Sequence, residues 1–416
     1  MYGDQGTGGL NPEALAQIPP ALQGVADQGL LSGFVTLVWR KGEIAQVNAI
    51  GHRDLEGKVP MTRDTLFRIA SMTKPVTSVA TLMLLEEGKL KLEDPVTKWL
   101  PEFADMQVLA DATGPIDQTS PAARDITVED LMTHRAGLAY GFTSVGPIAH
   151  AHEERLGSPL VNAMTPDEWL AALGSLPLSY PPGDRFHYSH ATDVLGFLVA
   201  RIEGKPLGEV LRERIFAPLG MDDTFFWAPP EKRERLAKLY KAPAEAGPLE
   251  DVSLPHPSKA PAFEGGGGGL ISTADDYLKF ARMLLGKGEV DGVRLLKPQT
   301  VELMTANRLT DAQRKIPFMG FPFWDAQGFG LGVSTILDEE KQAMVGAGSN
   351  GSFGWPGAFG TWWLADPKEE MVLIYLIQDS MPLEPESASQ LATGQRMGGR
   401  MVLPVFQKMV YAALGK

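Results

Sequence analysis

The hydrophobic positions of this 416-residue chain change their period along the sequence. The apolar runs Gly33–Arg40 and Glu43–Gly51 predict two strands joined by the turn Lys41-Gly42. Near the end, Gly357–Leu364 and Met371–Gln378 are also typical of strands, and Pro404–Leu414 has the period of a closing helix. Strand patterns at both ends, with helices between them, predict one sheet built from both chain termini and a helical insertion.

The middle of the chain, from Leu90 to about Leu219, has a mainly helical pattern with long loops. Helix starts are indicated by Ser, Thr or Asn caps and by proline in the first turn. These signals predict helices from Asn11-Pro12 to a stop before Pro19-Pro20, after Thr127, after Thr165-Pro166, over Asp193–Ile202, and from Ser272 or Thr273 through Leu285. Lys241–Glu264 is rich in proline and alanine without a clear period, which predicts a long surface loop.

The composition argues against several kinds of binding partner and catalytic site. A net charge of -13 and a pI near 5.1 argue against nucleic acid or an anionic membrane as a partner. With no cysteine, the chain has no disulfide, thiolate metal site or cysteine nucleophile. The first residues show no signal-peptide pattern, and no apolar run is long enough for a membrane helix. We therefore expect a soluble, cytoplasmic protein.

The stretch Phe67–Gly88 contains the strongest candidate for chemistry. Its second half has apolar residues at helical spacing and ends at Gly88. Pro75 fits only the first turn of a helix, which places the helix start near Ser71. Backbone N–H groups at a helix N-terminus favour developing negative charge, and Lys74 follows Ser71 one turn later on the same face. A serine in that position beside an amine is the arrangement of an activated nucleophile.

Each single motif also has a plainer interpretation. A Ser-x-x-Lys sequence is expected about once by chance in a chain of this length. In such a case the serine would cap a helix and the lysine would be solvated. Tyr188, after a Pro-Pro-Gly turn, could relay protons beside a cation, or could pack with its hydroxyl on a backbone carbonyl. The glycines around Trp355 could let the N–H of Ala358 join that of Ser71 in an oxyanion hole, or could form a bulge.

Other catalytic motifs are missing from the sequence. No Gly-x-Ser-x-Gly elbow occurs, since the segments around Ser349 and Ser352 each lack its first glycine. His150-Ala151-His152-Glu153-Glu154 lacks the spacing of a two-histidine zinc helix, and Gly265–Gly269 is not followed by the Lys-Ser/Thr of a phosphate loop. We expect no metal site and no cofactor.

In this order along the chain, the motifs resemble the serine hydrolases of the β-lactamase and penicillin-binding-protein superfamily. The resemblance is greatest to the class C β-lactamase-like branch called family VIII carboxylesterases. It extends over roughly Gly33 to Gln378 and rests on Phe67-Arg68-Ile69-Ala70-Ser71-Met72-Thr73-Lys74, Leu131-Met132-Thr133-His134-Arg135-Ala136-Gly137-Leu138, Pro182-Gly183-Asp184-Arg185-Phe186-His187-Tyr188-Ser189, Pro218-Leu219-Gly220-Met221 and Gly267-Gly268-Gly269-Leu270-Ile271-Ser272-Thr273. Five motifs in register are highly specific.

The resemblance implies an α/β (α+β) fold of the β-lactamase type, with a central antiparallel sheet flanked by helices and a mainly helical domain. Residues 1–84 and 261–416 would form the α/β domain, and residues 85–260 the inserted helical domain with long loops.

The resemblance also implies roles for individual residues. Ser71 would be the acylated nucleophile, Lys74 its base, and Tyr188 the tyrosine of a Tyr-x-Asn element. Oxyanion and substrate-binding roles would fall to Ala358, Trp355, Gly357, Tyr140 and Asp193. The chain departs from the pattern at His190, which replaces the asparagine of Tyr-x-Asn, and at Trp355, which replaces the lysine that binds a β-lactam carboxylate.

These roles predict a serine carboxylesterase that hydrolyses short-acyl esters through a Ser-Lys-Tyr acyl-enzyme. Two alternatives are enzymes of the same fold: a β-lactamase or amide hydrolase, and an acyltransferase. A third alternative is a non-catalytic binding protein. The expected partner is a small-molecule ester, without nucleic acid or membrane, and the expected assembly is a monomer or homodimer.

Overall fold

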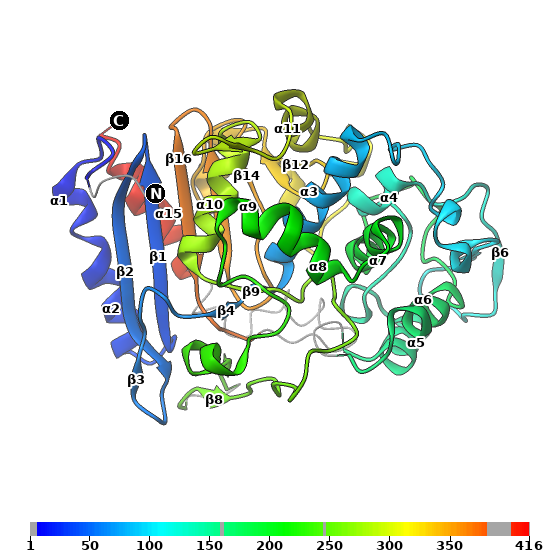
Figure 1. Ribbon diagram of the computed structural model, residues 1–416, viewed down its shortest axis with the longest axis horizontal. Helices are drawn as coiled ribbons and strands as arrows, with labels where there is room; N and C mark the ends of the chain where they lie inside the picture. The colour runs from blue at the N-terminus through cyan, green and yellow to red at the C-terminus, as the bar shows by residue number, and fades with distance from the viewer. Residues whose placement is uncertain (1–5, 159–161, 244–246, 381–400, 416) are drawn as a thin grey trace.

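A central antiparallel sheet organises the computed structural model, which describes residues 6–158, 162–243, 247–380 and 401–415 (Figure 1). The sheet has eight strands in the order β12-β13-β14-β15-β16-β1-β2-β3. Their bounds are β1 Gly33–Arg40, β2 Glu43–Asp54, β3 Val59–Pro60, β12 Gln327–Phe329, β13 Ser334–Ile336, β14 Phe353–Gly354, β15 Trp362–Asp366 and β16 Met371–Leu376. The predicted fold class is confirmed.

Strands from the first and last parts of the chain lie side by side in the middle of this sheet. Strand β1 pairs on one side with β2 and on the other with β16, with Val35 opposite Leu376. The hairpin turn between β1 and β2 has positive φ angles at both Lys41 and Gly42, as its tight geometry requires. The prediction of one sheet built from both ends of the chain is therefore confirmed.

The other half of the sheet departs from the predicted strand pattern. The prediction that the whole of Gly357–Leu364 forms a strand is wrong, because β15 begins only at Trp362. Before it, Gly360 adopts a positive φ of 80° and donates its N–H to the carbonyl of Gly357, which folds these residues into a turn. Strands β12, β13 and β14 are two or three residues long, which is too short to show a period in the sequence.

Helices cover both faces of the sheet. Helices α1 (Pro12–Leu15), α2 (Ile18–Asp27) and α15 (Val402–Ala412) pack on one face, and α10 (Ala274–Leu285) packs on the other (Figure 1). The predicted helix that begins at Asn11-Pro12 and ends before Pro19-Pro20 is confirmed as α1, which Asn11 caps. The helix that follows it, α2, was not predicted. Both prolines lie in the first turn of α2, where a missing N–H leaves no intrahelical hydrogen bond unmade.

The remaining helices lie mostly to the side of the sheet. They are α3 Thr73–Glu86, α4 Val128–Met132, α5 Pro147–Leu156, α6 Pro166–Gly174, α7 Ala191–Glu203, α8 Leu207–Leu211, α9 Ala217–Leu219, α11 Pro298–Thr305, α12 Asp311–Arg314 and α13 Glu339–Val345. Thr127, Thr165 and Thr273 cap α4, α6 and α10 through their side chains, as the sequence predicts. Helix α3 packs against α7 and joins the sheet core to these helices.

Short ribbons and helical turns connect these elements. The ribbons pair β4 Phe67–Arg68 with β9 Ile271–Ser272, β5 Gln107–Leu109 with β6 Thr119–Pro121, β7 Tyr240–Lys241 with β8 Glu250–Asp251, and β10 Glu289–Val290 with β11 Val293–Arg294. We propose that residues 85–260 form a mainly helical domain inserted into the α/β domain of residues 1–84 and 261–416. Of the helices in the described ranges, none has the length and apolar character needed to cross a bilayer.

Candidate active site

The candidate nucleophile lies where a helical turn enters helix α3. Ser71 is half-buried in the turn Ala70–Met72, which leads directly into α3. Ala70, immediately before it, has a φ of 45°, a left-handed conformation that is strained for a residue with a side chain. Pro75 lies in the first turn of α3, as predicted. The chain therefore turns sharply at the serine and presents it at a helix N-terminus.

Lys74 is buried beside Ser71, with only 1% of its surface exposed. Its Nζ lies 3.1 Å from Ser71 Oγ, 3.1 Å from the hydroxyl of Tyr140 and 2.6 Å from the carbonyl oxygen of Gly267. The carbonyl can only accept a hydrogen bond. Lys74 is thus held by two fixed oxygens on one side and faces the candidate nucleophile on the other.

A buried carboxylate holds the Tyr140 side of this arrangement. Asp193, on α7, accepts hydrogen bonds from the N–H of Gly267 at 2.8 Å and from the side chain of Tyr140, and its Oδ2 lies 3.0 Å from Nδ1 of His190. Burial, the nearby Asp193 charge and the hydrogen bond to Asp193 keep the pKa of Tyr140 well above its usual value. Tyr140 therefore stays protonated, with its proton directed to Asp193 and a lone pair toward Lys74.

Tyr188 lies on another side of Lys74. The ring of Tyr188 is 4.6 Å from Lys74 Nζ, and its hydroxyl accepts a 3.0 Å hydrogen bond from the indole Nε1 of Trp355. The ring of His134 packs against it with centroids 4.7 Å apart. Because the Trp355 N–H uses one lone pair of the Tyr188 oxygen, the hydroxyl proton of Tyr188 is still available to be donated to another group.

The turn after Trp355 packs directly against the residues before Ser71. The hydroxyl of Thr361 donates to the carbonyl of Ile69 at 3.0 Å, and Ala358 lies in the same apolar cluster as Ala70. A side chain at Gly357 would place its Cβ 2.4 Å from the Ile69 carbonyl oxygen, so only glycine allows this approach. The predicted meeting of the Gly357-Ala358 segment with the serine turn is thus present in the fold.

Three histidines near the site have lowered pKa values: His134 and His152, which are buried, and His187, which is half-buried. Burial lowers the pKa of His134, with the charge of Lys74 adding to it, and burial likewise lowers the pKa of His152. Burial lowers the pKa of His187 to about 4, helped by the charge of Arg185. In an unfolded chain each histidine would titrate near pH 6.5.

We therefore expect the free energy of unfolding to fall as the pH drops from about 6.5 toward 4. In that range the unfolded chain binds protons that the folded chain does not, which destabilises the fold by up to about 1.4 kcal/mol per pH unit for each histidine. Urea unfolding at a series of pH values measures this. His187→Gln should flatten the dependence by about one proton, and His150→Gln, an exposed control, should not. An equal slope in both variants would contradict the assignment.

Metal ligands are not gathered at this site. Across the described ranges, no group of three or more His, Cys, Asp or Glu side chains is placed to hold a metal ion.

Comparison with known proteins identifies the family. The Beta-lactamase family model matches residues 21–393. The chain belongs to the β-lactamase family. Esterase EstB of Burkholderia gladioli is 33% identical over 86% of this chain and 90% of its own length. Protein Rv1367c of Mycobacterium tuberculosis is 49% identical over 95% of this chain and 98% of its own. The structure of EstCE1, a hydrolase with promiscuous acyltransferase activity, superimposes with a TM-score of 0.78 at 27% identity, covering 96% of this chain and 99% of that one.

These findings confirm the resemblance to class C β-lactamase-like serine hydrolases and make this β-lactamase-family protein a hydrolytic enzyme. The structure brings Ser71, Lys74, Tyr140 and Tyr188 into one cluster and links Asp193 and Trp355 to it. The list of motifs gave no role to three residues that touch this cluster: Gly267, His134 and His190. The run of five glycines before Leu270 was the available signal for Gly267, because such a run lets a backbone approach a side chain closely.

Proposed function

We propose that this enzyme is a carboxylesterase of the family VIII type, which hydrolyses short-acyl esters through an acyl-enzyme on Ser71. The observation that carries the proposal is the placement of Lys74 Nζ, 3.1 Å from Ser71 Oγ and held by the Gly267 carbonyl and the Tyr140 hydroxyl. Esterase EstB, 33% identical, supports the choice of substrate class. The proposed partner is a small-molecule ester, and the proposed enzyme is a cytoplasmic monomer or homodimer.

In the first step, Lys74 takes the proton of Ser71. As a neutral amine it has two N–H groups and one lone pair; the N–H groups donate to Gly267 and Tyr140, so the lone pair faces Ser71 Oγ. The hydroxyl oxygen then forms a bond to the ester carbonyl carbon while its proton moves to Lys74. The N–H groups of Ser71 and Ala358 would stabilise the oxyanion.

In the second step, the bond from the carbonyl carbon to the alcohol oxygen breaks. Tyr188 gives its phenolic proton to the departing alcohol, and the proton that Lys74 took from Ser71 passes to the Tyr188 phenolate oxygen, which restores both side chains. Lys74 Nζ lies 4.6 Å from the centre of the Tyr188 ring. Water then attacks the acyl-enzyme, its proton passing through the same pair, and the acid leaves with Ser71 restored. The Trp355 indole keeps the Tyr188 hydroxyl oriented throughout.

Asp193 is proposed as a positioning residue that acts through Tyr140. Asp193→Asn removes one acceptor, so the Tyr140 proton is free to turn toward Lys74 and occupy its lone pair. Losing a buried hydrogen bond to a charged group should lower kcat about tenfold to a hundredfold with KM little changed, and should shift the pH profile of kcat. Steady-state kinetics with p-nitrophenyl butyrate measure both. Asp184→Asn, a solvent-exposed control, should leave kcat and its pH profile unchanged.

The result that would contradict this role is a change in thermal stability alone. If Asp193→Asn lowers the melting temperature while kcat and its pH profile stay at wild-type values, Asp193 only supports the fold.

Acyl transfer to an alcohol other than water is the second candidate function. Relatives named as acyltransferases support it, among them acyltransferase calJ of Penicillium decumbens, 28% identical over 74% of this chain and 75% of its own length. The acyl-enzyme would be the same, with the acceptor alcohol replacing water. Adding a competing alcohol to the esterase assay and measuring the new ester separates the two functions.

The proposed function is tested by parallel traces of p-nitrophenyl butyrate and nitrocefin. We expect ester cleavage, and weak or no β-lactam opening, because Trp355 replaces the cation that would bind a β-lactam carboxylate. Rapid nitrocefin opening with a silent ester trace would favour a β-lactamase. Failure of a serine-directed fluorophosphonate to label Ser71 would favour a non-catalytic binding protein.

A further inference from the structure

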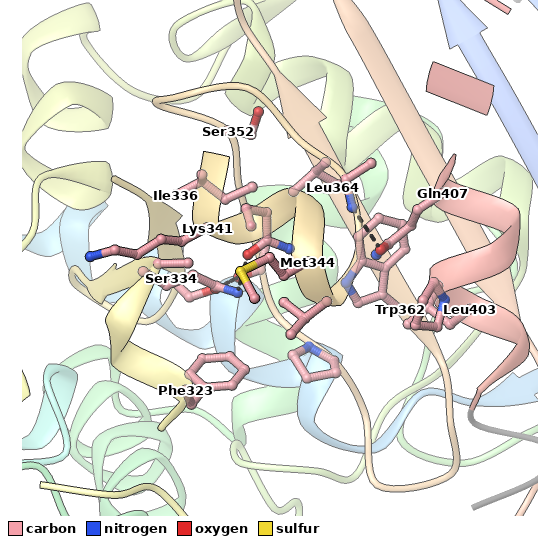
Figure 2. A pocket seen from close by; sticks show the side chains of 18 of the residues that line it. Phe323, Ser334, Ile336, Lys341, Met344, Ser352, Trp362, Leu364, Leu403 and Gln407 are labelled. Carbon is pink, nitrogen blue, oxygen red and sulfur yellow. Dashed lines mark hydrogen bonds between the residues drawn. The ribbon is translucent and has the colours of Figure 1, made fainter. Parts of the chain in front are cut away.

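A large cavity lies beside the candidate active site without including its nucleophile. Its volume is about 690 Å³, a size suited to a small organic molecule. Figure 2 shows it between Phe323 on one side and Leu403 and Gln407, which project from α15, on the other. Its lining also includes Trp362 and Leu364 of β15. Because α15 covers one sheet face and α10 the other, the cavity lies on the face opposite α10.

The cavity wall is largely apolar, and so is its rim. Met344 and Val345, at the end of α13, are 80% and 63% exposed, and Phe321 is 41% exposed. Large apolar side chains gathered at the surface around a cavity favour an apolar ligand. Met344 is flexible and polarisable, so it can adapt its shape to a hydrocarbon chain.

Trp355 joins this cavity to the proposed chemistry. It lines the cavity together with Pro356, and its indole Nε1 donates to the hydroxyl of Tyr188. In the proposed mechanism Tyr188 protonates the leaving alcohol. The alcohol oxygen must then lie next to Tyr188, and Trp355 is the side chain that both contacts Tyr188 and lines the cavity.

We infer that the cavity bordered by Phe323, Trp355 and Leu403 binds the apolar chain of the alcohol half of the ester. The inference rests on the proposed function and adds the substrate class: esters of a short acid with a long or bulky apolar alcohol. The short acyl group stays on the Ser71 side, and the alcohol chain passes Pro356 into the cavity. Esters with the long chain on the acid side do not use it.

Two isomeric esters test this directly, octyl butyrate and butyl octanoate, which contain the same atoms with the ester reversed. Leu403→Trp fills the cavity from α15, where Leu403 is half-buried. We expect this change to lower kcat/KM for octyl butyrate about tenfold or more and to leave ethyl butyrate and butyl octanoate within about twofold, because methylene groups in an apolar pocket give discrimination of that size. Val405→Trp, on the same helix but outside the cavity, is the matched control and should change none of the three.

Two results would overturn the inference: octyl butyrate hydrolysis unaffected by Leu403→Trp, or butyl octanoate as the ester that is lost. Retained activity on ethyl butyrate shows that the variant is folded; if it does not fold, Met344→Trp replaces it at the rim with the same expectations. If the wild type hydrolyses no ester at all, the proposed function fails. Calorimetric titration of Ser71→Ala with octyl butyrate then tests the cavity separately, and an unchanged Kd after adding Leu403→Trp would rule it out.

Discussion

Ser71→Ala is expected to abolish hydrolysis of p-nitrophenyl butyrate, with kcat/KM falling at least roughly 10⁴-fold. The reason is covalent: Ser71 Oγ supplies the bond that carries the acyl group, and a methyl group cannot replace it. The fold should be unaffected, because the side chain is half-buried at a helix entrance and loses a single hydrogen bond, to Lys74 Nζ. Initial rates under pseudo-first-order conditions measure the effect.

The matched control for this change is a serine that lies elsewhere in the fold. Ser349 is a buried serine in another loop, and its backbone N–H donates a hydrogen bond to Ser352 Oγ. Ser349→Ala therefore changes a serine that is not part of the Lys74 cluster. It should keep wild-type activity within a few-fold. If Ser71→Ala retains substantial activity while Ser349→Ala or Ser352→Ala loses it, the nucleophile has been assigned to the wrong residue.

Lys74→Met is expected to lower kcat by roughly 10²- to 10⁴-fold, the range of a lost general base. Methionine matches the length of lysine and fills the buried space, so packing against the rings of Tyr140 and Tyr188 is largely kept. What disappears is the group that takes the proton of Ser71 Oγ. Burst kinetics should show that acyl-enzyme formation is the slowed step.

Lys98→Met provides the control, because Lys98 is exposed and pairs with Asp94 at the surface, away from Ser71. It should leave kcat unchanged. A Lys74→Met variant with kcat within tenfold of the wild type would mean that another group, such as Tyr188, acts as the base by itself.

The central strands and capped helices could be predicted from sequence because their signals are local. The hairpin of Gly33–Arg40 and Glu43–Asp54 is rich in β-branched and aromatic residues around the turn Lys41-Gly42, and Thr127 and Thr165 lie directly before the helices they cap. The run Gly357–Leu364 misled because its strand-forming side chains start inside a turn that a glycine with positive φ allows. At this position the turn conformation of the backbone outweighs the strand preference of the side chains.

The serine and lysine of the site were also predictable, since they are one helical turn apart. The partners of Lys74 were not. Tyr140 and Gly267 lie 66 and 193 residues away along the chain, and only the packing of α3, α7 and the glycine run brings them to the amine. Similarly, the bond between Trp355 and Tyr188 joins residues that are 167 apart. Local spacing carries no information about such contacts.

The central claim is that Ser71 carries the acyl group during ester hydrolysis, and rapid acid quench followed by peptide mass spectrometry tests it most directly. The wild type is mixed with p-nitrophenyl butyrate, quenched during turnover and digested. The account predicts a butyryl group on the peptide that contains Ser71, and its loss in Ser71→Ala. A butyryl group on the peptide of Ser349 or Ser352, with Ser71 unmodified during active turnover, would contradict it.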